Sequence, residues 1–156
     1  MSAIKATDKF PTKVRFSGEG NIDTVWHFLG SGLPGKAAML KEPDQDGAYT
    51  IHLAPDARIN MAEYAIKKGG FTVTDVVMGK ETFRPWLERA KAEGFTHVIL
   101  VIYRPRKKVV EECDVGNGED PRKLVEESLS TFEIVGVYNL ALDLEQQLNQ
   151  ERPLNY

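Results

Sequence analysis

Residues 48–104 constrain the fold most, because β-type and helical segments alternate there with clear boundaries. Segments rich in β-branched or alternating apolar residues predict strands at Tyr49–Ala54, Phe71–Met78 and Val98–Ile102. Apolar residues at helical spacing between them predict two helices. The resulting β-α-β-α-β order is typical of an α/β or α+β domain, and we expect these strands to form one central mixed sheet.

Capping residues set the expected ends of the two helices. Gly69–Gly70 is predicted to end the first one, since glycine adopts the left-handed backbone that a C-cap requires. Asp56 and Thr82 are the predicted N-caps, because their side chains can accept hydrogen bonds from unpaired N–H groups. Pro85 then falls in a first turn, where its missing N–H removes no hydrogen bond.

The last strand of this region, Val98–Ile102, is apolar at five consecutive positions. Such a strand shows no alternation because both of its faces are covered. We therefore predict that it lies in the centre of the sheet.

The regions around this core predict further elements. Residues 36–41 and 48–54 enclose the turn cluster Pro43–Gly47 and predict an N-terminal hairpin. Asn21–Leu29 fits either a helix capped by Asn21 or a strand, and we favour the helix.

The C-terminal region predicts helices. Asp120–Pro121 combines an N-cap with a proline at the first helical position, which predicts a helix over Arg122–Leu129. Thr131–Leu148 fits either one helix or a strand over Phe132–Tyr138 followed by a helix from Leu140. The sequence alone leaves both alternatives open.

Composition predicts one domain over residues 1–156, with flexible ends at 1–10 and 151–156. No apolar run approaches the roughly 20 residues of a membrane helix, and the N-terminus lacks the apolar core of a signal peptide. The single cysteine, Cys113, excludes an internal disulfide. Together these features predict a cytoplasmic protein without a membrane partner.

Positive charge is concentrated next to the predicted central strand. Residues 1–110 carry a net charge of +5, whereas residues 111–156 carry −8, in a chain whose total is −3. The densest positive run contains Arg104, Arg106, Lys107 and Lys108. In open α/β sheets ligands bind beyond the carboxyl ends of strands, and arginine matches phosphate oxygens. These four residues are the predicted anion-binding site, although the run also fits a solvated turn.

Residues 30–37, Gly-Ser-Gly-Leu-Pro-Gly-Lys-Ala, resemble a phosphate-binding loop. The pattern departs at Ala37, which has no hydroxyl for magnesium, and Pro43 leaves no room for the long helix that such a loop precedes. We interpret the segment as a loop leading into a hairpin strand, and we predict no nucleotide cofactor. Lys36 remains a weaker candidate for an anion ligand.

The remaining reactive side chains give weak signals. His27, His52 and His97 lack the spacing of a helical metal motif, and no metal site is predicted. His52 and His97 are weaker site candidates, because neighbouring strands could bring them together. Cys113 could pair with a histidine as a nucleophile, although a lone cysteine is more often inert.

Three functional hypotheses follow. The first is a non-enzymatic binding or adaptor module whose basic residues dock an acidic protein surface or RNA; the absence of a complete catalytic motif favours it. The second is a small enzyme acting on a phosphorylated or anionic small molecule, with Arg104, Arg106 and Lys36 as anion ligands and His52 or His97 as acid or base. The third is a self-associating structural or assembly protein. The sequence does not specify the oligomeric state.

We predict that ATP with magnesium does not bind the loop, because the hydroxyl and the long helix are both missing. Backbone amide shifts recorded during a titration test this. Saturable shifts centred on Gly35 and Lys36 would contradict the prediction.

Overall fold

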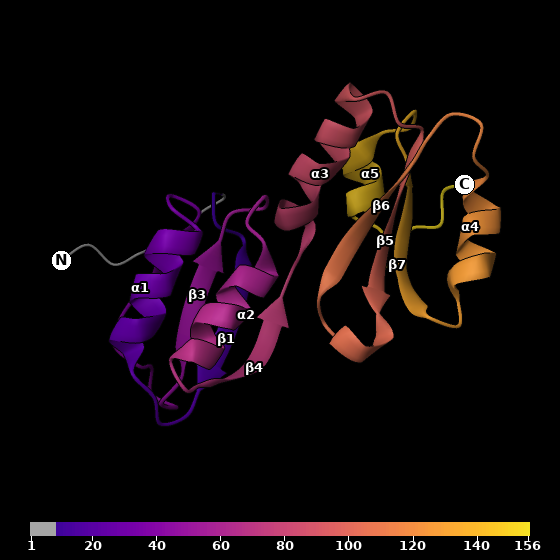
Figure 1. Cartoon of the computed structure of the whole chain (residues 1–156). Helices are drawn as coiled ribbons and strands as arrows, with labels where there is room; N and C mark the ends of the chain where they lie inside the picture. Colours follow the sequence, from indigo (N-terminus) through magenta and orange to yellow (C-terminus); the bar gives the residue numbers. More distant parts are fainter. Residues whose placement is uncertain (1–8) are drawn as a thin grey trace. The chain divides into compact units, whose positions relative to one another are not determined.

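The structure, a computed structural model, describes residues 9–156 as an α+β fold with two antiparallel sheets. The chain divides into two compact units, the first ending at Thr82 and the second beginning at Phe83, and each contains one sheet (Figure 1). The α+β class and the β-α-β-α-β order of residues 48–104 are as predicted. The single central mixed sheet is not found, because the strands of this region pair mainly with strands from outside it.

The first unit has the β-α-β-β-α-β order of a ferredoxin-like, or split βαβ, motif. Its sheet has the strand order β2-β3-β1-β4, and all neighbouring strands are antiparallel. Val14 of the central strand β1 lies opposite Ile51 of β3 and Val76 of β4. The elements are β1 (Thr12–Ser17), α1 (Ile22–Gly32), β2 (Ala37–Met39), β3 (Tyr49–Leu53), α2 (Ile59–Lys68) and β4 (Thr72–Val77).

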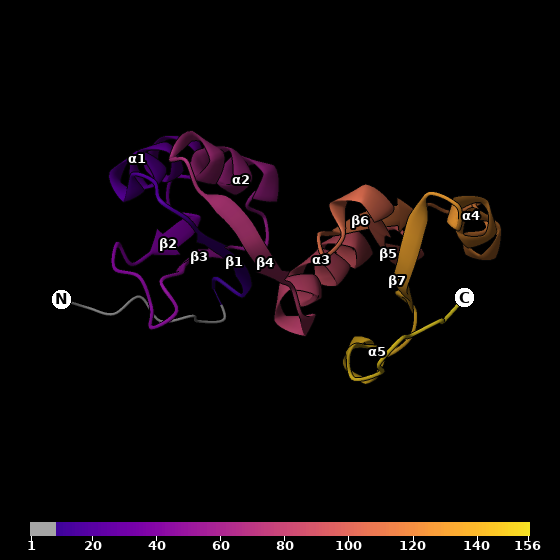
Figure 2. The ribbon, with the colours of Figure 1, turned by 90° about the horizontal axis from the view of Figure 1, so that it is seen from below.

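Both helices of the first unit lie on one face of its sheet (Figure 2). Val14 and Phe16 alternate with Lys13 and Arg15 along β1, and only the apolar pair is fully buried. The Phe16 ring contacts the rings of Tyr49 and Phe71, with centroids 5.4 and 5.1 Å away. The opposite, outer face of the sheet therefore carries the charged residues of β1 and, by the same alternation, Thr50 and His52 of β3.

Local capping signals explain two helix ends of the first unit and fail at a third. Asn21 Oδ1 accepts hydrogen bonds from the N–H groups of Asp23 and Thr24 at 2.9 and 3.3 Å, so the helical alternative for this segment is confirmed. Gly70 has φ +87° just after α2, as expected for a C-cap glycine. Asp56 is not an N-cap, because the chain makes another turn and α2 starts after Arg58.

Helix α3 (Lys80–Ala92) starts earlier than predicted. Thr82 is not its N-cap: the side chain is buried, and its Oγ1 lies 3.1 Å from Oγ1 of Thr12. This tertiary hydrogen bond replaces the expected local one. Pro85 consequently lies inside the helix rather than in its first turn.

The second unit has a three-stranded sheet with the order β6-β5-β7. Strand β5 is central, as predicted, and Ile99 lies opposite Cys113 of β6 and Val137 of β7. After α3 the elements are β5 (His97–Tyr103), the 3₁₀ turn η1 (Arg104–Arg106), β6 (Val110–Val115), α4 (Pro121–Ser128), β7 (Phe132–Asn139) and α5 (Leu144–Leu148).

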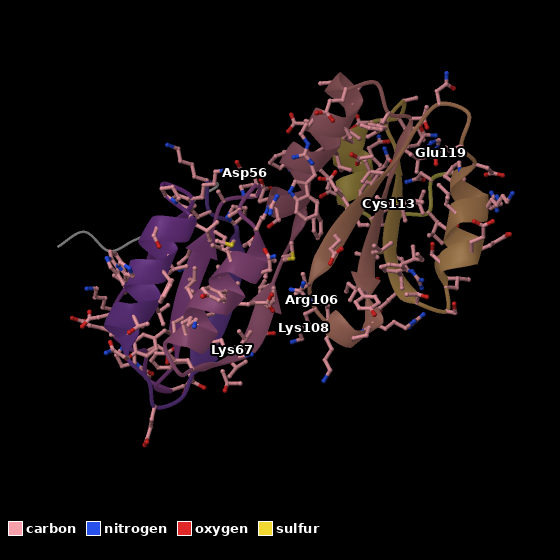
Figure 3. All side chains as sticks on the ribbon, in the orientation of Figure 1. Asp56, Lys67, Arg106, Lys108, Cys113 and Glu119 are labelled. Atoms are coloured by element: carbon pink, nitrogen blue, oxygen red, sulfur yellow. The ribbon has the colours of Figure 1, made fainter. Side chains whose placement is uncertain are left out.

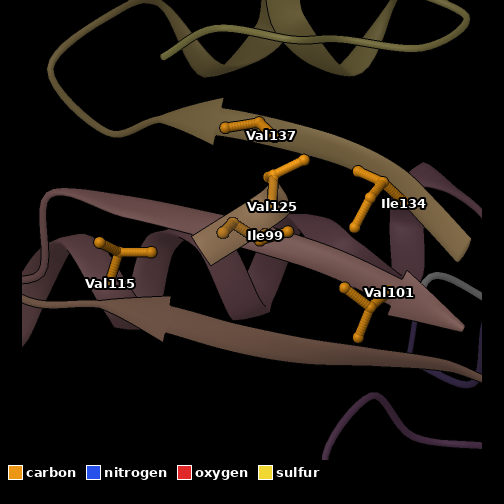
Figure 4. Packing of buried hydrophobic residues seen from close by; sticks show 6 residues of the cluster. All are labelled: Ile99, Val101, Val115, Val125, Ile134 and Val137. Carbon is orange, nitrogen blue, oxygen red and sulfur yellow. The ribbon is translucent and has the colours of Figure 1, made fainter. Parts of the chain in front are cut away.

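Both faces of β5 are covered, which explains its unbroken apolar run. One face joins the core cluster that α4 covers, in which Val125 of the helix packs among strand residues (Figure 4). The other face carries Leu100, which is fully buried; Leu87 and Ala90 of α3 are also fully buried. The cluster consists of Ile99, Val101, Val115, Val125, Ile134 and Val137.

The C-terminal segment adopts the strand-plus-helix alternative, with β7 followed by α5. Gln147 is buried and its amide group spans this turn: Oε1 accepts from the Asn139 N–H at 2.7 Å, and Nε2 donates to the Asn139 carbonyl at 2.9 Å. Residues 151–156, for which flexibility was predicted, run beside β7. Val137 donates to the Pro153 carbonyl at 2.7 Å and accepts from the Asn155 N–H at 3.0 Å.

Replacing Leu100 with alanine should lower the free energy of unfolding by about 2–5 kcal/mol, because it leaves a cavity between the sheet and its cover. Chemical denaturation measures this loss. The same change at Leu142, which is 50% exposed, should cost less than about 0.5 kcal/mol. Equal effects of the two changes would mean that β5 is not a buried central strand.

Candidate functional site

The predicted anion-binding residues form one turn, here called the basic turn (Arg104–Lys108), between β5 and β6. Arg104, Lys107 and Lys108 are exposed, and Arg106 is half-buried. Arg106 and Lys108 lie at the same end of the second unit, whereas Glu119 lies at its other end (Figure 3). The turn therefore concentrates positive charge at one end of the sheet.

Arg104 has a structural role within the basic turn. Its Nη2 donates to the carbonyls of Leu129 and Phe132 at 2.7 and 3.1 Å, and its N–H donates to the Thr131 carbonyl at 3.2 Å. The guanidinium thus ties the turn to the segment that enters β7. Two of its five N–H groups are used in this way, so an anion would meet a cation already fixed in position.

Lys107 has an unusual backbone for a non-glycine residue. Its φ is +52°, and it is the only described residue other than glycine with a positive φ. With ψ at −103° the residue lies in a sparsely populated region of backbone conformation, which costs an L-residue roughly 1–3 kcal/mol. The turn therefore holds a lysine where glycine would fit with less strain.

Apolar and aromatic side chains lie beside the basic turn, and sequence reasoning did not identify them. Tyr103 is 40% exposed, and its ring centroid lies 5.6 Å from that of Phe132. Leu129, whose carbonyl accepts a hydrogen bond from Arg104, has a side chain that is 48% exposed. Tyr103 and Phe132 are far apart in sequence, and only the β5–β7 pairing brings them together.

The position of the basic turn beyond the end of β5 does not by itself indicate a ligand site. The carboxyl-end rule applies to parallel strands, but the sheet of the second unit is antiparallel, so the rule gives no reason to place a ligand at the basic turn. The acidic residues from Glu111 onward lie in the strands and helices that complete the second unit and in the segments between them.

The weaker candidates belong to different parts of the chain. Lys36 and His52 belong to the first unit, whereas His97 belongs to the second. His27 is exposed on α1, on the other side of the first sheet from His52. Within the second unit, His97 begins β5 and the basic turn follows the end of that strand. Within residues 9–156, no group of three or more His, Cys, Asp or Glu side chains could hold a metal ion.

The glycine-rich segment 30–36 consists of the last turn of α1, which ends at Gly32, and a tight turn that leads into strand β2. This helix-to-strand order is the reverse of the order in a phosphate-binding loop. Lys36 Nζ lies 2.9 Å from Oδ2 of Asp56. The loop lines a hollow of about 300 Å³ whose other walls include Trp26, Leu29 and Met39. The lining side chains carry no charge, and the indole N–H of Trp26 is their one hydrogen-bond donor, so they match a phosphate poorly.

Cys113 is exposed on β6. Burial of part of its side chain, together with the charges of Asp114 and Glu119, raises the pKa of the thiol. A raised pKa lowers the thiolate fraction at neutral pH, which makes the sulfur a poorer nucleophile.

Glu112 and Asp114 form a carboxyl pair on one face of β6, two residues apart. Burial, followed by a hydrogen bond with Asp114 and that residue's charge, raises the pKa of Glu112 to about 7. Arg89 of α3 forms an ion pair with Glu112 and opposes this shift, but the raised pKa means that burial and Asp114 outweigh it. The sequence signal that could have revealed this pair is the spacing of two acidic residues at alternate positions between Val110 and Val115, as in a strand.

No family model, no curated protein and no solved structure matches this chain. Among residues 9–156, no helix is long and apolar enough to cross a membrane. Function must therefore be argued from the side chains and their geometry.

Replacing Glu112 with glutamine should stabilise the protein at pH 8 relative to wild type, and this advantage should shrink towards pH 5. A carboxyl with a raised pKa stabilises the fold in its protonated form. That contribution is complete below the ordinary value of 4.5 and is lost as the pH rises through about 7. The difference in unfolding free energy should change by about 1–3 kcal/mol across this range in urea titrations.

The neighbouring change Glu111→Gln provides the control. Glu111 is exposed and points to the other face of β6, so its effect should vary little with pH. An effect of Glu112→Gln that is equally flat would contradict the raised pKa.

Proposed function

We propose that this protein is a non-enzymatic binding module that docks an anionic partner through the basic turn. The observation that carries the proposal is the grouping of four cationic side chains on one exposed turn, with Arg104 fixed by two carbonyls. A prefixed guanidinium loses little conformational entropy when it binds an anion. A cytoplasmic location belongs to the same proposal.

Single-stranded RNA is the anionic partner that the neighbouring side chains favour. Tyr103 and Phe132 provide aromatic surface directly beside the cations, and Tyr103 is 40% exposed. Proteins that bind single strands combine backbone-neutralising cations with aromatic rings on which bases stack. An acidic protein surface would use the cations but would gain less from the rings.

The enzyme alternative finds less support. Within the second unit, His97 begins β5 whereas Arg104 and Arg106 follow the end of that strand, so the length of β5 separates this acid–base candidate from the two anion ligands. Self-association is a further alternative, for which β2 and β4 provide outer edges that pair with no other described strand.

Charge reversal at Arg106 and Lys107 should abolish binding of labelled oligouridine, because each neutralised phosphate releases counterions. Fluorescence anisotropy across a salt series measures the affinity and its salt slope, which should fall by about 0.7 for each lost contact. The matched control reverses Lys91 and Lys123, which are exposed on α3 and α4 and change the net charge equally.

Tyr103→Ala distinguishes the two partner classes. It should weaken RNA binding by about 1–3 kcal/mol, the usual value of one stacked base, and leave polyglutamate binding unchanged. Melting temperatures show whether each variant is folded. If wild type does not bind oligouridine even at low salt, or if both charge reversals act equally, the proposal fails.

A further inference from the structure

We propose that the outer face of the first sheet holds a second site, which binds an organic cation: a primary ammonium or a guanidinium on a short aliphatic stem. The site is a pocket of about 290 Å³ beneath the β2–β3 connection. It belongs to the first unit and does not depend on the basic turn. Its lining residues are Leu40, Glu42, Pro43, Asp44, Ala48, Thr50 and His52.

His52 provides the first observation. It points outward from β3, and its Nδ1 is buried without a hydrogen-bond partner among the described residues. A buried nitrogen without a partner is unfavourable, and a ligand that forms a hydrogen bond with it removes this cost. Burial and the charge of Lys13 lower the pKa of His52, so the ring is neutral at pH 7 and one of its nitrogens is an acceptor.

The β2–β3 connection provides acidic groups at the same pocket. Asp44 is fixed by three contacts: its Oδ1 accepts from the N–H groups of Asp46 and Ala48 at 2.8 and 3.0 Å, and its Oδ2 lies 2.8 Å from Arg15 Nη2. These contacts hold the connection over the sheet and occupy both carboxylate oxygens of Asp44. Glu42 is exposed and forms no salt bridge among the described residues, so its charge is available to a ligand.

These groups together select the chemistry of the ligand. A neutral imidazole, a carboxylate and the Thr50 hydroxyl can all accept hydrogen bonds, which suits a group with several donors and positive charge. Leu40 and Pro43 provide apolar contact for a stem. Lys13 lies opposite His52 on β1, and its positive charge opposes a doubly charged cation more strongly than a singly charged one. An ammonium or guanidinium group fits this arrangement, whether it belongs to a free amine or to a lysine or arginine of another protein.

Titration with butylammonium and butylguanidinium tests the site, with butyrate as the anionic control. We expect saturable amide shifts over residues 40–52 and a shift of the His52 ring nitrogens in two-dimensional NMR spectra. His52→Phe should weaken binding about tenfold or more, because it removes an acceptor for a charged donor. Glu42→Gln should weaken it about threefold, as expected for an exposed ion pair.

Matched controls are His27→Phe on α1 and the exposed change Glu19→Gln, both of which should leave the affinity unchanged. An arginine-containing peptide that binds more than tenfold tighter than butylguanidinium would identify a protein side chain as the ligand. Equal affinities would identify a free amine. Unmoved His52 nitrogens, equal binding of butyrate, or full affinity in His52→Phe would each overturn the proposal.

Discussion

Burial of strand β5 on both faces is the constraint on which the second unit depends. Its backbone is paired on both edges, by β6 and β7, and its side chains are covered from both sides. Elements on each face can keep their apolar residues from water only while this strand stays in place. The basic turn begins directly after β5, so the position of every cation in it follows from the position of this strand.

Local signals in the sequence predicted local structure well. Asn21, Gly70 and Asp120 each act through a side chain or backbone angle within a few residues, and each marks a helix end in the structure. Thr82 misled the same reasoning, because its hydroxyl bonds to Thr12 rather than to the nearby helix. A helix cap can be predicted from sequence only where no distant residue takes the hydrogen bond of the capping side chain.

The sequence did not predict which strands are neighbours in each sheet. Strand β1 inserts between β3 and β4, and β5 pairs with two later strands, so neighbours along residues 48–104 are not neighbours in a sheet. The candidate sites likewise differ in whether they depend on residues that are close in sequence or on strand pairing. The cations of the basic turn are adjacent in sequence, so the sequence alone groups them. The contact of Tyr103 with Phe132 and the pocket beneath the β2–β3 connection depend on strand pairing, which the sequence did not predict.

The hydrogen bonds between residues 153–155 and Val137 occupy part of the outer edge of β7. A strand edge whose backbone groups are already bonded cannot accept a strand from another molecule, so the middle of β7 is closed to such addition. The opposite edge, β6, carries Glu111, Glu112 and Asp114 within four residues. Two such edges repel each other when their carboxylates are ionised, and this repulsion protects the second unit from edge-to-edge aggregation.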